Sequence, residues 1–70
     1  MNLTISVNGG KKDIVKSMTI ADLLKAENVD SEARFVAVAI NNMVIPRSKW
    51  CFTEINQGDS VEIVRPAPGG

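Results

Sequence analysis

Residues 19–28 are Thr-Ile-Ala-Asp-Leu-Leu-Lys-Ala-Glu-Asn, and this stretch predicts the helix around which the fold is built. The Thr19 hydroxyl can accept the backbone N–H three residues on, while Asp22 places a carboxylate in the first turn, where the helix dipole favours it. The apolar residues that share one face are Ile20, Leu23 and Leu24. Asn28 tolerates the left-handed conformation that ends a helix. One short amphipathic helix is therefore predicted, and its apolar face requires a second layer.

The residues before this helix predict a β-hairpin. Apolar and polar residues alternate over residues 2–8, as in a strand with one buried face. Asn8–Lys12 has turn chemistry, because asparagine and glycine tolerate positive φ, and Asp13–Ser17 is expected as the returning strand. The run Gly9–Lys12 lacks the spacing and the Ser/Thr of a phosphate-binding loop, which favours the turn and leaves no recognisable ATP site in the chain.

The residues after the polar connection that follows the helix predict three more strands. Phe35–Ile40 is short and apolar on both faces, which predicts an interior strand. Asn41-Asn42 predicts a tight turn, and Met43–Ile45 predicts a brief strand that Pro46 ends, because proline cannot donate a ladder hydrogen bond. After another turn, Ser60–Arg65 is expected as the last strand.

The segment Arg47–Ile55 is expected to wrap along the edge of the core and to pack its two aromatic residues, Trp50 and Phe52, against it. Cys51 could accept a persulfide, but a cysteine between two aromatic residues is more typical of a small buried apolar residue, and we expect it to be buried. Arg47 is expected to be solvated, with at most a minor contact to a partner.

The order of elements predicts an α+β domain, with one helix on one face of a small mixed sheet. The first and last strands are expected as parallel neighbours at the centre of that sheet, which is the β-grasp or ubiquitin-like arrangement. The domain is expected to span residues 1–65, and residues 66–70 are expected as a flexible, extended C-terminal tail.

The sheet face away from the helix is a candidate docking surface. If Val38 and its period-two neighbours face the helix, then Ala37, Ala39 and Val64 face outward and form a flat apolar patch beside the tail, suited to an adenylating enzyme. A shift of one residue would invert this assignment, and scattered exposed apolar residues also occur without a function.

The composition excludes several classes of function. Eight Lys/Arg balance eight Asp/Glu and each half of the chain is neutral, so no nucleic-acid surface is expected. With no histidine and one cysteine, histidine catalysis, metal clusters and a disulfide are excluded, and no cofactor is expected. The longest apolar run is far short of the ~20 residues that span a membrane, so a soluble cytoplasmic protein is expected. Seventy residues leave few side chains for a buried active site, so we do not expect an enzyme.

The last five residues, Pro-Ala-Pro-Gly-Gly, carry the chemical signal. A carboxylate is a poor acyl donor, but coupling it to AMP gives a mixed anhydride that a sulfur nucleophile can attack. Glycine has no Cβ, so Gly69 would let another protein's catalytic groups approach the Gly70 carbonyl, and the prolines would hold the preceding segment extended. The alternative is a frayed end without a function.

Residues 39–50, Ala-Ile-Asn-Asn-Met-Val-Ile-Pro-Arg-Ser-Lys-Trp, resemble the Asn-x-x-[Val/Ile]-[Val/Ile]-Pro-Arg-x-x-Trp signature of the ThiS family, the sulfur carriers of thiamine biosynthesis. Gly58–Ile63 and the Gly-Gly end are also similar, and the resemblance covers the whole chain. Pro66 and Pro68 depart from the family, whose tails carry less proline. Because each proline removes a backbone donor, fewer main-chain hydrogen bonds to a partner channel are expected.

The resemblance implies a carrier that other proteins act upon. An ATP-dependent, ThiF-like adenylating enzyme would convert the Gly70 carboxylate to an acyl-adenylate. Sulfur from a cysteine persulfide would replace AMP and leave a thiocarboxylate on Gly70. A ThiG-like thiazole synthase would then take that sulfur into the thiazole ring of thiamine.

Two other interpretations stay open. The sulfur carrier subunit of molybdopterin synthase shares the fold and the Gly-Gly end, although the Pro46–Trp50 run favours thiamine. A non-covalent β-grasp interaction module with an incidental Gly-Gly end would not need the carboxylate at all.

Overall fold

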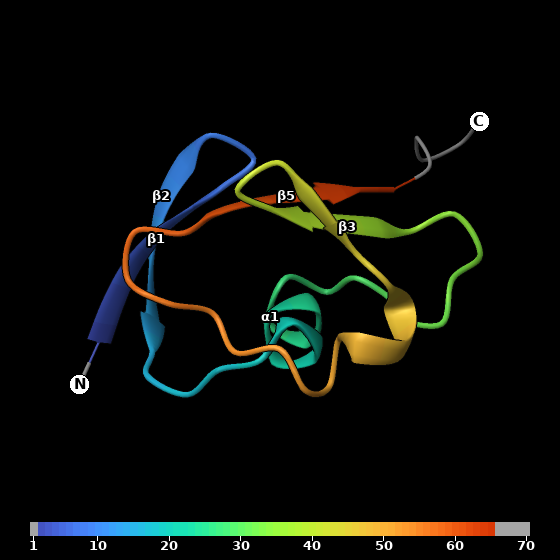
Figure 1. Cartoon of the computed structure of the whole chain (residues 1–70), viewed down its shortest axis with the longest axis horizontal. Helices are drawn as coiled ribbons and strands as arrows, with labels where there is room; N and C mark the ends of the chain where they lie inside the picture. Colours follow the sequence, from blue (N-terminus) through green and yellow to red (C-terminus); the bar gives the residue numbers. More distant parts are fainter. Residues whose placement is uncertain (1, 66–70) are drawn as a thin grey trace.

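The computed structural model describes residues 2–65, in which five strands form one mixed sheet and a helix lies on one of its faces (Figure 1). In chain order the elements are β1 (Asn2–Val7), β2 (Gly10–Val15), α1 (Ile20–Ala26), β3 (Ala37–Ile40), β4 (Met43–Ile45), the 3₁₀ helix η1 (Arg47–Lys49) and β5 (Ser60–Val64). The predicted α+β class is confirmed. The tail expected over residues 66–70, which includes Gly69 and Gly70, lies outside the described residues.

The sheet has the strand order β2-β1-β5-β3-β4. Its central pair, β1 and β5, is parallel, with Val7 opposite Val61, whereas the other three pairs are antiparallel. The expected parallel pairing of the first and last strands is therefore confirmed, and the chain has the β-grasp arrangement.

The N-terminal hairpin is tighter than the sequence suggested. Asn8 and Gly9 alone form the turn, at φ values of 50° and 86°, and Val7 pairs directly with Gly10. Two successive residues with positive φ suit a two-residue hairpin, whose twist matches that of the strands. The prediction of a turn over Asn8–Lys12 and a strand over Asp13–Ser17 was therefore wrong, since β2 begins at Gly10 and ends at Val15.

The helix α1 begins and ends as its sequence predicted. The Asp22 backbone N–H donates to the Thr19 hydroxyl at 3.2 Å, and the Thr19 backbone N–H donates to the Asp22 carboxylate at 3.1 Å. This reciprocal pair satisfies two amides at a helix start that no intrahelical carbonyl could reach. After the C-cap Glu27, Asn28 takes a φ of 58° and turns the chain away.

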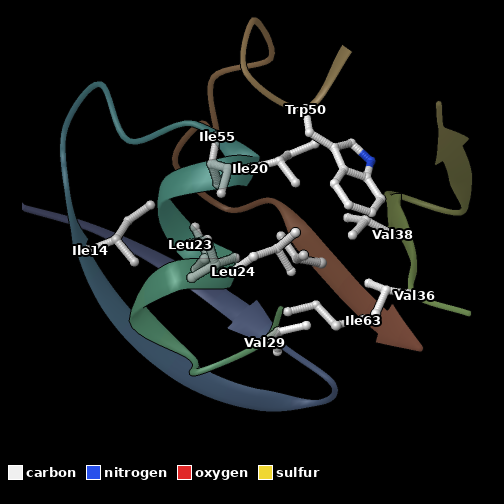
Figure 2. Close-up of a cluster of buried hydrophobic side chains, with 12 residues drawn as sticks. Ile14, Ile20, Leu23, Leu24, Val29, Val36, Val38, Trp50, Ile55 and Ile63 are labelled. Atoms are coloured by element: carbon white, nitrogen blue, oxygen red, sulfur yellow. The ribbon is translucent and has the colours of Figure 1, made fainter. Parts of the chain in front are cut away.

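The core lies between α1 and the sheet (Figure 2). The helix contributes fully buried Ile20, Leu23 and Leu24, and the sheet contributes Val38 and Val61. The predicted packing of Trp50 is confirmed: its side chain is 3% exposed and its indole N–H donates to the Ile45 carbonyl at 2.9 Å.

Two aromatic residues lie outside this core. Phe35, expected in an interior strand, precedes β3 and is 72% exposed, because the adjacent Val36 takes the buried position. Phe52, expected to pack on the core, is 83% exposed, because Trp50 fills that space and the chain turns outward after it. Within residues 2–65, no helix combines the length and the apolarity that a bilayer crossing requires.

Candidate functional site

The end of β5 is where the structure approaches the predicted reactive residues. Gly69 and Gly70 themselves lie outside the described residues, and Arg65 is the last one described. The Cα partner of Val64 is Ala37, so the end of β5 lies beside the start of β3 (Figure 1). The candidate site is therefore this end of the sheet and its outer face.

The structure places all three predicted docking residues on the face away from α1. Their period-two neighbours Val38 and Ile63 are buried against the helix. Ala37 is exposed, Ala39 is half-buried and Val64 is 60% exposed. Their orientation follows the register, and a docking role stays a prediction.

Two further residues lie on the outer face: Glu62, which alternation along the last strand puts on the same face as Val64, and Val44, which was not predicted there. Val44 of β4 lies opposite Ala39 and is 71% exposed, and Glu62 of β5 lies opposite Ala39 on the other side. The two-residue turn Asn41-Asn42 fixes the register that brings Val44 to this face, so the turn was the signal for it. We call Ala37, Ala39, Val44, Glu62 and Val64 the outer patch.

The side chain of an asparagine from each hairpin turn bonds to the backbone of β5. The Asn8 side chain accepts the Ile63 N–H at 2.8 Å and donates to the Ile63 carbonyl at 3.3 Å. The Asn41 side chain accepts the Ser60 N–H at 2.9 Å. Both asparagines have positive φ, and neither bond has a counterpart in the strand ladders. The strand that leads to the tail is thus fixed at both of its ends.

Arg47 is exposed, as predicted, but it also has a structural role that the sequence did not predict. Its guanidinium carbon lies 4.7 Å from the centroid of the Trp50 ring. The same group donates to backbone carbonyls of the connection between α1 and β3, namely those of Ser31, Ala33 and Val36. A planar guanidinium with several donors suits this role, because the loop carbonyls have no ladder partner.

Cys51 is an exposed free thiol, so its predicted burial was wrong. It follows Trp50 directly in a turn, and Trp50 takes the core position that this segment can fill. An open hollow beside it is lined by Arg34, Arg47 and the edge of Trp50, among others. The hollow lies by η1 and the connection after α1, not on the outer patch.

Charged groups of the described residues form one ion pair, between Lys12 and Glu27 at 2.6 Å. Over residues 2–65, no three carboxylates or thiols gather into a group that could hold a metal ion. Hydrogen bonds from the Thr19 backbone and side chain hold the pKa of the Asp22 carboxyl below the ordinary 3.8. The Asp22 carboxylate accepts the Thr19 backbone N–H and so caps the start of α1.

Comparisons with known proteins match this geometry. The profile of the ThiS family matches residues 5–70. A crystal structure of the thiamine biosynthesis protein ThiS from Geobacter metallireducens is 30% identical, with a TM-score of 0.79, and covers 97% of this chain and 100% of that chain. A solution NMR structure of a thiamine biosynthesis protein from the same organism is 31% identical, with a TM-score of 0.77, and covers 97% of this chain and 88% of that one.

A longer relative is also similar. A thiazole synthase from Paramagnetospirillum magneticum is 37% identical over 68 residues, which are 97% of this chain and 20% of that protein. The chain therefore spans about a fifth of the length of this curated relative. Because the family profile covers nearly the whole chain and the solved structures share its five-stranded sheet and helix, the chain belongs to the ThiS family.

Proposed function

We propose that this chain is a sulfur carrier of thiamine biosynthesis and that the carbonyl carbon of Gly70 is its reacting atom. Membership of the ThiS family and likeness to thiamine biosynthesis proteins support a sulfur carrier role. The observation that carries the proposal is that the family match runs through residue 70 and so includes the Gly-Gly end. In this scheme the chain carries the sulfur, and its partner enzymes catalyse the reactions.

The chemistry proceeds in steps that other proteins catalyse. On a ThiF-like enzyme, a Gly70 carboxylate oxygen attacks the α-phosphorus of ATP, and pyrophosphate leaves. The terminal sulfur of a cysteine persulfide then attacks the acyl carbon, and AMP leaves with the electron pair. A second thiol reduces the resulting acyl disulfide, which releases the Gly70 thiocarboxylate and leaves the donor cysteine in a disulfide.

The proposal also gives the folded body a role, which is to hold β5, the strand that precedes the tail, in place. β5 lies at the centre of the sheet between β1 and β3, and the side chains of Asn8 and Asn41 bond to its backbone. The proposed docking residues Ala37, Ala39 and Val64 lie where β5 ends, so an enzyme held there would be next to the tail. Gly69 would let catalytic groups reach the Gly70 carbonyl, because no Cβ shields it.

Thiazole synthase is the acceptor that the comparisons favour. In P. magneticum a region similar to this chain belongs to a longer protein described as a thiazole synthase. A carrier-like region in the same protein as the synthase supports direct transfer of sulfur between the two. The likeness to thiamine biosynthesis structures also favours this route over the molybdopterin alternative.

Mass spectrometry of the intact chain tests the proposal. Incubation with a ThiF-like enzyme, ATP, a persulfide donor and a thiol should replace one oxygen of Gly70 by sulfur. A chain lacking Gly70, or carrying it as an amide, should gain no sulfur under the same conditions. Absence of the mass gain with an enzyme that is active on another carrier would refute the proposal. Thiamine auxotrophy on deletion, with molybdoenzymes intact, would separate it from the molybdopterin alternative.

A further inference from the structure

Two exposed side chains flank the proposed docking residues and serve no structural role. Phe35 is 72% exposed, and Glu62 is exposed on the β5 side of the outer patch, with Ala39 between it and Val44. Neither side chain makes a hydrogen bond or an ion pair within residues 2–65. An exposed aromatic ring and an unpaired carboxylate are features that a binding partner can use.

Phe35 lies close to the point where the chain leaves the sheet. It precedes Ala37 by two residues, which can span at most about 7 Å. The Cα atom of Ala37 is paired with that of Val64, and β5 passes directly from Val64 to Arg65. The backbone of Phe35 is therefore close to the end of β5.

The length of the tail limits where the adenylating enzyme can sit. This step rests on the proposed function, in which Gly70 reacts. The five residues that follow Arg65 can carry Gly70 at most about 18 Å from it, even when fully extended. An enzyme that holds the Gly70 carbonyl in its active site therefore has to cover the end of the sheet that carries Phe35 and Val64.

The negative charge of Glu62 requires a positively charged group at the opposite position of this enzyme. Glu62 lies opposite Ala39 in the ladder, and Ala39 lies opposite Val44. The other members of the outer patch, which are Ala37, Ala39, Val44 and Val64, are all apolar. Among the described residues, no cation lies within 4.0 Å of the Glu62 carboxylate. Covering an unpaired carboxylate is unfavourable unless a partner group pairs with it.

We propose that Phe35 and Glu62 determine which adenylating enzyme this carrier accepts. The enzyme receives the Phe35 ring in an apolar recess and places a lysine or arginine opposite Glu62. The apolar members of the outer patch provide the flat contact area between these two features. A carrier with the same fold but a different pair of side chains at these positions would dock poorly on the same enzyme.

Binding of the purified ThiF-like enzyme, measured by calorimetry without ATP, tests this inference. Phe35→Ala should raise the dissociation constant by roughly 10-fold or more, as for an aromatic anchor at an interface. Glu62→Gln should raise the dissociation constant by roughly 5-fold and reduce the dependence of binding on salt, because one charge pair is lost. Both variants should unfold at the wild-type urea concentration, because both side chains are exposed.

The chain offers a matched control for each variant. Phe52 is 83% exposed and Glu54 is exposed without a hydrogen bond or ion pair of its side chain in the described part of the chain. Both lie in the segment that packs on the start of α1, where the Ile20 N–H donates to the Thr53 carbonyl at 3.0 Å. Phe52→Ala and Glu54→Gln make the same two changes in this segment, outside the outer patch, and should bind as the wild type does.

The outcomes separate this inference from the proposed function. Equal binding by Phe35→Ala, Glu62→Gln and their controls would overturn the inference while thiocarboxylate formation on Gly70 still upheld the carrier role. Failure of the wild-type chain to bind the enzyme would overturn the inference as well. Concentration-dependent dimerisation that Phe35→Ala abolishes, without an effect on enzyme binding, would assign the surface to a second copy and also overturn it.

Discussion

Arg47 stacks on Trp50, with its guanidinium carbon 4.7 Å from the ring centroid. The indole N–H of Trp50 donates to the carbonyl of Ile45, so this bond holds the edge of the ring while the guanidinium covers one of its faces. The guanidinium also bonds to the carbonyls of the connection between α1 and β3, at Ser31, Ala33 and Val36. The Pro-Arg-x-x-Trp part of the family signature is thus a clamp that closes this connection over the edge of the core.

Arg47→Lys should lower the free energy of unfolding by about 1–2 kcal/mol, because lysine keeps the charge but not the planar fork of donors or the stacking. Urea denaturation followed by circular dichroism would measure this loss. Hydrogen exchange should also become faster in residues 31–36. Lys49→Arg is the control, because Lys49 is exposed and its side chain makes no bond within the described residues. Equal urea midpoints for the two variants would contradict the stabilising role of the Arg47 guanidinium.

Asn8→Gly should destabilise the fold by about 1–2 kcal/mol, because the side chain that pairs with Ile63 is lost. Glycine suits the φ of 50° at this position, so the loss measures the amide contacts and not backbone strain. Asn42→Gly is the matched control, since Asn42 has a φ of 68° and no side-chain hydrogen bond among residues 2–65. Faster exchange of the Ile63 amide is expected in Asn8→Gly alone. Similar stabilities of both variants would show that Asn8 does not anchor β5.

Asp22→Asn should remove a pH-dependent part of the stability. Hydrogen bonds from Thr19 lower the folded-state pKa of Asp22 below its ordinary 3.8, so the stabilisation is complete above that value and is lost as pH falls through the lower folded-state pKa. The difference in unfolding free energy between wild type and Asp22→Asn should therefore be largest near neutral pH and shrink below about pH 4. Urea titrations across this range, with Ser48→Ala as a non-titrating control, would measure it. A difference that stays constant down to low pH would contradict this assignment.

The parts of the fold that could be predicted from sequence have local signals. The cap formed by Thr19 and Asp22 and the turn at Asn41-Asn42 depend on neighbouring residues, so residue type and spacing identified them. The start of β2 was predicted wrongly because its ladder bonds use backbone groups of Gly10–Lys12, whose residue types are typical of a turn. Secondary structure at that point depends on pairing with β1, which no local pattern reveals.

The candidate site shows the same division. Alternation along β3 and β5 was enough to orient Ala37 and Val64 outward, once the register was set. The role of Arg47 could not be predicted, because its carbonyl partners lie 11 to 16 residues away in a connection without periodicity. The exposure of Cys51 and Phe52 depended on which aromatic residue reached the core, and only packing of the whole chain decides that.

Gly69→Ala should slow sulfur loading without affecting the fold. The added methyl group lies next to the carbonyl that the proposal makes reactive, where a small displacement of the acyl carbon costs roughly 10- to 100-fold in rate. Among residues 2–65, the buried core residues all lie between Ile5 and Ile63, so the unfolding midpoint should stay at the wild-type value. The rate of thiocarboxylate formation, followed by intact mass with a ThiF-like enzyme, is the measurement. Ala67→Gly is the control, because it changes one methyl group two residues earlier and should load at the normal rate. Normal loading of Gly69→Ala would show that the partner channel has room for a side chain, and the proposed need for glycine next to the reacting carbonyl would then be wrong.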